Sequence, residues 1–140
     1  MYWYLEGLRN YDNFSGRASK SEFWYFQCGN ILVLLGLFCM SLIGSSLIGF
    51  TYYHVIGIYF IYLFCFTMLI PSATVTVRRL HDTGRSGRWG LVLLIPFVGI
   101  VMMMIFLLED SQPIVNRYGA EPGDLNIVNN EVLDDHLLKL

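Results

Sequence analysis

The chain has 140 residues, which is enough for one small domain. Apolar residues make up 55% of it and charged residues only 14%, whereas a soluble globular protein has roughly 45–50% and about 25%. The few basic residues do not form the broad basic face that nucleic-acid binding requires. This composition favours a small integral membrane protein over a soluble helical bundle, and it predicts no nucleic-acid partner.

The start of the chain is polar and rich in aromatic side chains. Tyr4, Leu8 and Tyr11 recur with helical spacing. We therefore expect either a short helix in the lipid headgroup region or an irregular arm. Further along, residues 19–22 (Ser-Lys-Ser-Glu) have the pattern of a capping box, in which the Ser and Glu side chains bond each other's backbone amides. This pattern predicts that the first long helix begins there.

A run from Phe23 to Val77 contains no Asp, Glu, Lys or Arg. It is long enough for two helices of about 20 residues that each cross the hydrocarbon layer, joined by a tight turn. We expect these helices at residues 24–46 and 55–77, with the turn at 49–54. The end of the first span has four small residues, which would allow the two helices to approach closely, namely Ser41, Gly44, Ser45 and Ser46.

The second predicted span carries a polar stripe. Thr67, Pro71, Thr74 and Arg78 follow helical spacing and so share one face. Pro71 is expected to kink the helix because it removes a backbone hydrogen bond. The threonine hydroxyls then either satisfy backbone groups freed by the kink or form a polar seam against another helix or a groove.

A polar segment at residues 78–89 interrupts the apolar sequence and holds four of the nine basic residues. We expect it to be a short loop at the membrane surface, with Gly84 and Gly87 in the turn. Basic residues flank both ends of the two-span hairpin, whereas the turn between the spans has none. By the positive-inside rule, the N-terminus and the polar segment are predicted to be cytoplasmic.

The third apolar run, Trp89 to Leu108, has 20 residues, and as one helix it would be about 30 Å long, which matches the hydrocarbon thickness. Pro96-Phe97-Val98-Gly99 interrupts it at the centre. We favour a third transmembrane helix at 89–108, kinked at this point, which places the acidic tail outside. The alternative is a re-entrant hairpin of two half-length arms, which returns the tail to the cytoplasm.

Together these features predict an all-α integral membrane protein with three transmembrane helices in a single membrane domain, residues 1–122. The remaining residues, 123–140, form an acidic tail that is expected to be a short amphipathic helix or disordered. The first apolar run is too long for a cleavable signal peptide and continues into a second span, so the first span is expected to act as its own insertion signal.

Four motifs recur in order along the chain. They are Phe14-x-Gly16-Arg17-x-Ser19-Lys20-x-Glu22-Phe23-Trp24, Arg78-Arg79-Leu80-His81-Asp82-Thr83-Gly84-Arg85-Ser86, Leu94-Ile95-Pro96-x-x-Gly99 and Asn116-Arg117-Tyr118-Gly119-x-x-Pro122. These motifs resemble the signature of a bacterial family, the YhaH/YhaI-like inner-membrane proteins (domain of unknown function 805). Lys20 stands where the family often has Arg. The resemblance implies a protein of the bacterial cytoplasmic membrane and brings no established activity.

Three classes of function are compatible with the sequence. The favoured one is a non-catalytic accessory, assembly or lipid-contacting protein, because arginines at one membrane face attract anionic headgroups. Its expected partners are membrane lipids, and a second copy or another membrane protein. The second is a subunit of an oligomeric transporter or channel, suggested by the polar stripe and the broken third segment, although the spans contain no charge.

The third class is a membrane enzyme that acts on lipid headgroups through His81 and Asp82. No evident nucleophile, second carboxylate or metal-ligand cluster accompanies these two residues in the sequence. We therefore expect no enzymatic activity, no cofactor and no metal site.

The candidate contact residues are the charged side chains and the histidine near the two cytoplasmic ends, namely Arg17, Lys20, Glu22, Arg78, Arg79, His81, Asp82, Arg85 and Arg88. Helices joined by a tight turn run antiparallel, so these ends should be neighbours. We predict that Asp82 pairs with Arg17 and that Glu22 pairs with Arg78 or Arg79, with His81 hydrogen-bonded nearby. Such pairs would hold the polar segment against the first long helix.

Overall fold

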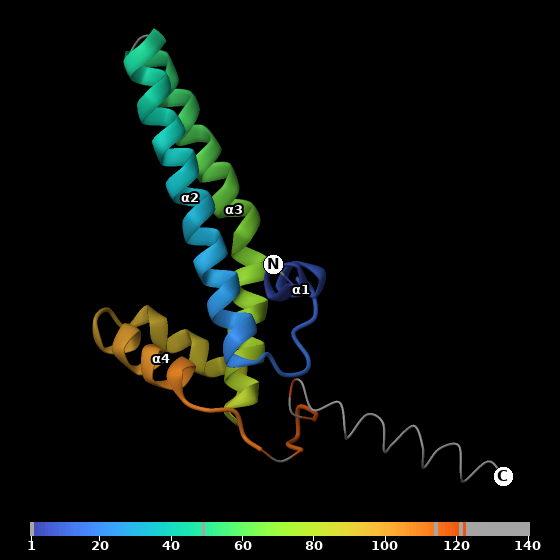
Figure 1. Cartoon of the computed structure of the whole chain (residues 1–140). Coiled ribbons are helices and arrows are strands. Elements are labelled where there is room, and N and C mark those ends of the chain that lie inside the picture. The colour runs from blue at the N-terminus through green and yellow to red at the C-terminus, as the bar shows by residue number, and fades with distance from the viewer. Residues whose placement is uncertain (1, 49, 114, 121, 123–140) are drawn as a thin grey trace, which may run out of the picture. The chain divides into compact units, whose positions relative to one another are not determined.

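The computed structural model describes residues 2–48, 50–113, 115–120 and 122. Its helices are α1 (Tyr2–Arg9), α2 (Lys20–Ile48), α3 (Phe50–Asp82), the 3-10 helix η1 (Gly87–Leu94) and α4 (Val98–Leu108), labelled in Figure 1. Apart from these helices, the described residues contain one isolated backbone bridge, between Asn116 and Gly119. The predicted all-helical class is therefore confirmed for the described part of the chain, and the tail predicted at 123–140 lies outside it.

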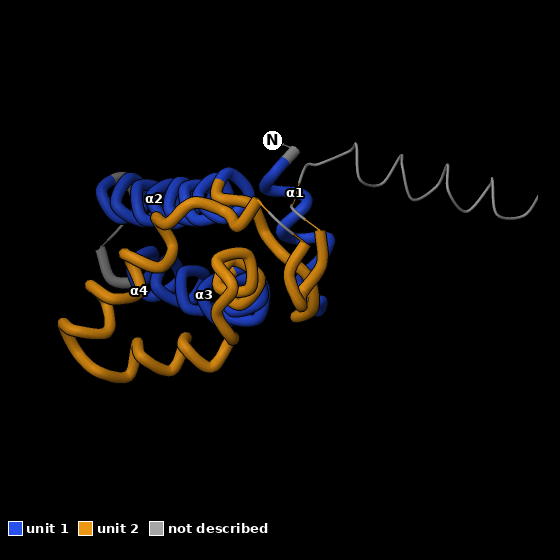
Figure 2. The backbone as a smooth tube through the Cα atoms, turned by 90° about the horizontal axis from the view of Figure 1, so that it is seen from below, with its two compact units in different colours: residues 1–13, 21–75 blue, residues 14–20, 76–140 orange. Residues whose placement is uncertain are grey.

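The chain forms two compact units, which Figure 2 shows in different colours. The first unit comprises Met1–Asn13 and Ser21–Val75, and so contains α1, nearly all of α2 and most of α3. The second comprises Phe14–Lys20 and Thr76–Leu140, and so contains the segment before α2, the last two turns of α3, η1, α4 and the residues after α4.

Two helices in the described residues are long and apolar enough to cross a membrane, over Lys20–Ser46 and Tyr52–Asp82. In their most apolar windows only 17% and 6% of the residues are buried within the protein. Helices that are apolar on all sides and yet exposed are suited to a lipid environment. These helices contain the spans predicted at 24–46 and 55–77, and α2 begins at Lys20, where the capping-box pattern predicts a helix start.

In the first unit, α2 and α3 run side by side (Figure 1), and small residues bring them into close contact. A Cβ atom on Gly57 would clash with the Ser41 side chain, and one on Gly44 would lie 2.8 Å from the ring of Tyr53. The predicted close approach at Ser41 and Gly44 is thus confirmed.

The turn between α2 and α3 is shorter than predicted. α3 already begins at Phe50, so the expectation of a turn over 49–54 is wrong for all but residue 49, which lies outside the described residues. The physical reason is that continued helix satisfies the backbone amides and carbonyls internally, which matters most near a membrane.

The start of the chain is a helix, α1, which packs on α2 in the first unit. The Tyr4 ring stacks on Phe26 with centroids 5.4 Å apart, and its hydroxyl donates to Asn30 Oδ1 at 3.2 Å. A Cβ on Gly7 would lie 2.6 Å from the Phe26 ring, so a small residue at this point allows the contact. The helical alternative is therefore the correct one for this segment.

The hydroxyls of the polar stripe on α3 turn to backbone carbonyls. Thr67 donates to Leu63 O at 2.8 Å, and Thr74 Oγ1 lies 2.9 Å from Ile70 O and 2.6 Å from Tyr11 O. The carbonyl that Pro71 leaves without its amide partner is that of Thr67, which is not one of these acceptors. The threonine hydroxyls of the stripe thus donate to backbone carbonyls, but not to the carbonyl that Pro71 leaves without a partner.

α3 continues through residues 78–82, so the prediction of a loop over the whole polar segment is wrong for these residues. The helix ends in a Schellman motif: the Gly84 amide donates to His81 O at 3.0 Å and the Arg85 amide to Leu80 O at 2.9 Å. Gly84 has φ 76°, a conformation that glycine adopts at little cost. The predicted role of Gly84 in the turn is confirmed, and the turn lies later than expected because the polar side chains before it are buried.

The third apolar run does not form one helix. η1 ends at Leu94 and α4 begins at Val98. Trp89, near the start of η1, packs edge-to-face on Phe106, near the end of α4, with centroids 5.4 Å apart. The two helices are therefore antiparallel, and we call residues 85–109 the 85–109 hairpin.

The expectation of a single helix over 89–108 is wrong, and the arrangement corresponds to the alternative of two short arms. Pro96 lacks an amide hydrogen, and Phe97 has φ 62°, outside the helical region. Gly99 then brings the arms into backbone contact, since any Cβ at this position would clash with Val92 O.

Candidate functional site

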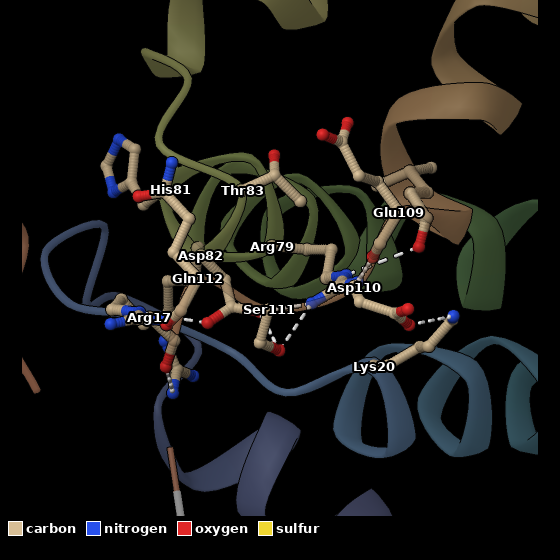
Figure 3. A network of polar contacts seen from close by, with 12 residues as sticks. Arg17, Lys20, Arg79, His81, Asp82, Thr83, Glu109, Asp110, Ser111 and Gln112 are labelled. Carbon is tan, nitrogen blue, oxygen red and sulfur yellow. Dashed lines mark hydrogen bonds and ion pairs between the residues drawn. The ribbon is translucent and has the colours of Figure 1, made fainter. Parts of the chain in front are cut away.

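Polar side chains of the second unit converge on the carboxylate of Asp82 (Figure 3). Arg17 Nε donates to Asp82 Oδ1 at 2.9 Å, while Arg79 and Ser111 donate to Oδ2. The exposed fraction of the Arg17 side chain is 1%, and that of Arg79 and Asp82 is 0%. The predicted Arg17–Asp82 ion pair is therefore confirmed. We call the side chains of Arg17, Arg79, Asp82 and Ser111 the Asp82 cluster.

Three segments position the cluster. Asp82 ends α3, and Arg79 lies one turn earlier on the same helix face. The segment before α2 is tied to α3 by the Ala18 amide, which donates to Arg78 O at 3.1 Å. The segment after α4 is tied to it by the Gln112 amide, which donates to Asp82 O at 3.2 Å. Backbone hydrogen bonds thus bring Arg17 and Ser111 to the end of α3.

The remaining guanidinium donors reach backbone carbonyls. Arg79 Nε donates to Leu107 O at 3.3 Å, and another Arg79 nitrogen donates to Glu109 O. Carbonyls at the end of a helix lack partners within it, so Arg79 caps α4 with a positive charge at the end that favours one. Arg17 donates to Gln112 O, and to Gly119 O at 3.3 Å. Both buried arginines are therefore extensively hydrogen-bonded, as burial of a charge requires.

His81 belongs to a separate contact. Its ring stacks on Tyr118 with centroids 3.7 Å apart and an angle of 3° between the planes, and its Nδ1 lies 3.2 Å from Gly16 O. Consecutive residues of a helix do not face each other, and Figure 3 shows the imidazole pointing away from the Asp82 carboxylate. His81 is hydrogen-bonded as predicted, but it does not form a catalytic pair with Asp82.

Tyr118 is placed by a tight turn that the sequence indicates only as a motif. Asn116 and Gly119 exchange backbone hydrogen bonds of 3.2 and 3.0 Å, and the Tyr118 amide donates to Asn116 Oδ1 at 2.9 Å. The Asn116 amide group donates to His81 O at 3.0 Å. The Asn-Arg-Tyr-Gly motif therefore docks on the end of α3.

Outside the cluster, charged side chains form more exposed pairs. Lys20 Nζ lies 2.8 Å from Asp110 Oδ1, and this hydrogen bond lowers the pKa of the Asp110 carboxyl. Arg85 pairs with Glu109, and its guanidinium lies 4.2 Å from the centroid of the Phe106 ring. In the part of the chain that the structure describes, the exposed Arg88 guanidinium has no ion-pair or hydrogen-bond partner.

Glu22 and Arg78 are both predicted to be contact residues, and both are buried. Glu22 is 3% exposed and Arg78 is 7% exposed, and Arg78 Nη2 donates to Arg17 O at 3.2 Å. The pairing of Glu22 with Arg78 or Arg79 stays a prediction. Sequence reasoning also missed Ser111 and Gln112, which follow α4 in an unremarkable polar stretch. The carbonyl acceptors had no side-chain signal that could reveal them.

The geometry of the Asp82 cluster suits a structural clamp. Both carboxylate oxygens already accept hydrogen bonds from buried donors, so neither is presented to solvent. Within the described residues, no group of three or more His, Cys, Asp or Glu side chains is arranged to hold a metal ion.

Two membrane-length apolar helices, an apolar hairpin and a buried charge cluster define a class of small helical proteins with membrane-spanning potential. The chain belongs to the family described as Protein of unknown function (DUF805), whose match covers residues 11–120. This confirms the family resemblance that the four motifs indicate.

Named relatives occur in Escherichia coli (strain K12). The chain is 35% identical to the inner membrane protein YhaI over 122 residues, which covers 87% of this chain and 96% of the relative. It is 37% identical to the inner membrane protein YhaH over 128 residues, which covers 87% and 97%. It is also 33% identical to the uncharacterized protein YiiR over 87 residues, which covers 61% and 52%. No solved structure matches the chain.

Proposed function

We propose that this chain is a non-catalytic inner-membrane protein of the accessory, assembly or lipid-contacting class, in which the Asp82 cluster is a structural clamp. The inner-membrane location is supported by the similarity to YhaI and YhaH over nearly their whole length. The observation that carries the non-catalytic role is the Asp82 carboxylate, which is fully buried and accepts hydrogen bonds from Arg17, Arg79 and Ser111.

Catalysis through His81 and Asp82 would need a different arrangement. A general base must present a lone pair to the substrate, whereas the Asp82 oxygens are engaged internally and one face of the His81 ring is covered by Tyr118. Arg17 and Arg79, the arginines that contact Asp82, are likewise engaged by Asp82 and by backbone carbonyls. The cluster therefore favours a structural role over an enzymatic one.

The 85–109 hairpin supports a re-entrant arrangement in place of a third span. η1 has 8 residues and α4 has 11, so each arm is about 16 Å long, half of the roughly 30 Å hydrocarbon layer. At the tip, Leu94 is 80% exposed and Phe97 is 84% exposed, whereas the ion pair of Arg85 and Glu109 lies at the base. An apolar tip and a charged base suit a hairpin that enters one leaflet and returns.

Three backbone amides at the tip are bonded within the hairpin, which lowers the cost of placing this backbone in lipid. Irregular backbone at membrane depth is costly when its amides are unbonded. Here Pro96 has no amide hydrogen, and the amides of Ile95, Val98 and Gly99 donate to Val92 O, Pro96 O and Ile95 O. We therefore place the N-terminus, the polar segment and the C-terminus on the cytoplasmic side, since the basic residues flanking α2 and α3 favour that side.

A topology experiment tests this arrangement. After replacement of the three native cysteines, a cysteine at Tyr53 should react with an impermeant reagent added outside intact cells, and one at Ser86 should not. A reporter that is active only in the cytoplasm should be active when fused after Leu140. A tail reporter that is active only outside would support a third transmembrane span instead. Labelling of the Ser86 probe from outside would show that the proposed orientation is wrong.

A functional assay separates the three classes. The full chain in liposomes should release no lipid headgroup and carry no ion flux above protein-free liposomes, and a pull-down from native membranes should recover a stoichiometric membrane-protein partner or the chain with bound lipid. Headgroup release that His81→Gln abolishes without loss of folded protein would establish the enzyme class. Ion flux that follows the amount of reconstituted chain would establish the transporter class.

A further inference from the structure

We infer that the first arm of the 85–109 hairpin binds one anionic phospholipid, with its phosphate at Arg88 and an acyl chain along Leu91, Val92 and Ile95. The inference rests on the re-entrant placement proposed above and adds to it a ligand class and a site. It assigns a role to Arg88, the one arginine of residues 78–89 that makes no ion pair or hydrogen bond within the described residues.

The site is a groove of about 340 Å³ lined by Arg88, Trp89, Leu91, Val92 and Ile95. Four of these residues belong to η1, and Ile95 directly follows it. None of the η1 residues is buried within the protein. The groove leads from the charged base of the hairpin toward its apolar tip. If the hairpin enters one leaflet, a phospholipid of that leaflet has its charged headgroup near Arg88 and its acyl chains near the apolar residues that lie closer to the tip.

The charge of Arg88 distinguishes this groove. Arg79 is committed to Asp82, and Arg85 is committed to Glu109 and Phe106. Arg88 is exposed and has no ion-pair or hydrogen-bond partner among the described residues. A guanidinium matches two phosphate oxygens at once. By contrast, a cavity of about 400 Å³ between α2 and α3 has no charged residue in its lining, so nothing there would select an anion.

Trp89 places the groove at the right depth. Trp89 follows Arg88 in sequence and lines the same groove, and its ring is held edge-to-face against Phe106. Amphipathic aromatic rings favour the boundary between headgroups and hydrocarbon. Gly99 lets the two arms meet backbone to backbone, which fixes the wall that Val92 provides. Arg88 is therefore at headgroup level when the tip is in hydrocarbon.

The apolar walls point to a lipid and not to a soluble anion. Inorganic phosphate would gain only the contact with Arg88, whereas a phospholipid also covers Leu91, Val92 and Ile95. Proximity to an anionic headgroup is worth about 1 kcal/mol for one basic residue, which corresponds to about a fivefold preference for an anionic over a zwitterionic lipid.

Trp89 supplies a local probe. The chain has three tryptophans, so the full-length Trp3→Phe/Trp24→Phe variant reports from Trp89 alone. We would reconstitute it in phosphatidylcholine vesicles that contain equal mole fractions of either brominated phosphatidylglycerol or brominated phosphatidylcholine. Brominated phosphatidylglycerol should quench Trp89 with about fivefold higher apparent affinity at low salt, and the preference should shrink as salt is added.

Two matched variants test the assignment to Arg88. Arg88→Gln should abolish the preference, whereas Arg9→Gln, which removes another exposed arginine with no described side-chain partner, should leave it unchanged. Equal quenching by the two lipids in the parent would overturn the anionic site while leaving the re-entrant placement intact. Quenching by neither lipid would overturn both proposals, because Trp89 would then lie outside the bilayer.

A second measurement avoids the tryptophan substitutions. Native mass spectrometry of the unmodified chain from mixed lipid micelles should retain one phosphatidylglycerol, and the Arg88→Gln variant should lose this selectivity. Inorganic phosphate should displace the lipid no better than chloride at the same ionic strength. Specific displacement by phosphate, or equal retention of both lipids, would overturn the site.

Discussion

Arg17 and Asp82 are 65 residues apart in sequence, and Arg17 Nε lies 2.9 Å from Asp82 Oδ1 in a pair whose side chains are at most 1% exposed. Burying two charges costs several kcal/mol per ion, and this cost is offset only when the other donors and acceptors are also bonded. Here the second Asp82 oxygen accepts from Arg79 and Ser111. A change at one member should therefore affect the whole cluster.

Asp82→Asn should be strongly destabilising, because it leaves two buried arginines without their counter-charge. We expect the free energy of unfolding in detergent to fall by about 3–5 kcal/mol, with a matching loss of folded yield on size-exclusion chromatography. Asp110→Asn is the control, since this carboxylate is exposed, and it should lose much less stability than Asp82→Asn. An Asp82→Asn protein as stable as the parent would refute the clamp.

Reversing the pair should not rescue it. Arg17→Asp and Asp82→Arg will each lower the folded yield, and so will the double variant. The reason is that Arg17 also donates hydrogen bonds to the carbonyls of Gln112 and Gly119. An aspartate at this position has no donor, so these carbonyls would lose their partner and face another acceptor. Recovery of the double variant in the same detergent assay would mean that the ion pair alone matters and that these carbonyl contacts do not.

Gly84→Ala should destabilise the end of α3 by about 1–2 kcal/mol, the usual cost of a left-handed conformation for a residue with a Cβ. The new methyl group would also meet the Gln112 side chain, 2.4–2.8 Å away in the present arrangement, so that side chain must move. Gly90→Ala is the matched control, because its Cβ would meet nothing within 4 Å. Thermal unfolding of both variants in the same detergent gives the comparison; equal melting temperatures would exclude the proposed role of Gly84.

Gly99→Ala should separate the arms of the 85–109 hairpin. Its Cβ would clash with Val92 O, a backbone atom that cannot rotate away. Overpacking of this kind costs about 1–3 kcal/mol. Spin labels introduced at Leu91 and Ile105 should report a wider distance distribution, while Gly36→Ala, whose Cβ meets nothing within 4 Å, should leave it unchanged. An unaltered distribution in Gly99→Ala would show that the contact is dispensable.

The carboxyl of Asp110 should titrate below its ordinary pKa of 3.8, chiefly because it accepts a hydrogen bond from Lys20. A depressed carboxyl pKa contributes stability above the pKa of the unfolded state, and this contribution disappears as the pH falls through the folded-state value. Carbon-13 NMR of the labelled side chain can follow the titration. Lys20→Gln should return the pKa toward its ordinary value, and an unchanged titration in that variant would assign the shift to another group.

The long helices and one contact of the site were predictable from sequence. An uncharged run long enough for two membrane-spanning helices predicts the positions of α2 and α3. Opposite charges at the neighbouring ends of these helices predict the Arg17–Asp82 pair. Each of these features has a side-chain signal, either apolar length or charge.

The features that sequence reasoning missed depend on backbone groups. Arg79 caps the carbonyls of Leu107 and Glu109, and any sequence offers such acceptors, so no residue type marks them. The break before α4 was visible at Pro96, but 20 uncharged residues fit a straight span equally well by length. Only the positive φ of Phe97 and the contact of Gly99 with Val92 decide between a kink and a reversal.

The hydrogen bond from Arg17 to Gly119 O links residues that are 102 positions apart, and this has a consequence for biosynthesis. A ribosome adds roughly 5–20 residues per second, so Gly119 follows Arg17 by roughly 5–20 s. During that interval α2 and α3 can already enter the membrane, while the Arg17 guanidinium must remain hydrated outside the bilayer. The Asp82 cluster is therefore completed late, and a nascent chain that stalls before residue 111 lacks the hydrogen bonds that Ser111 and Gln112 supply to Asp82 and Arg17.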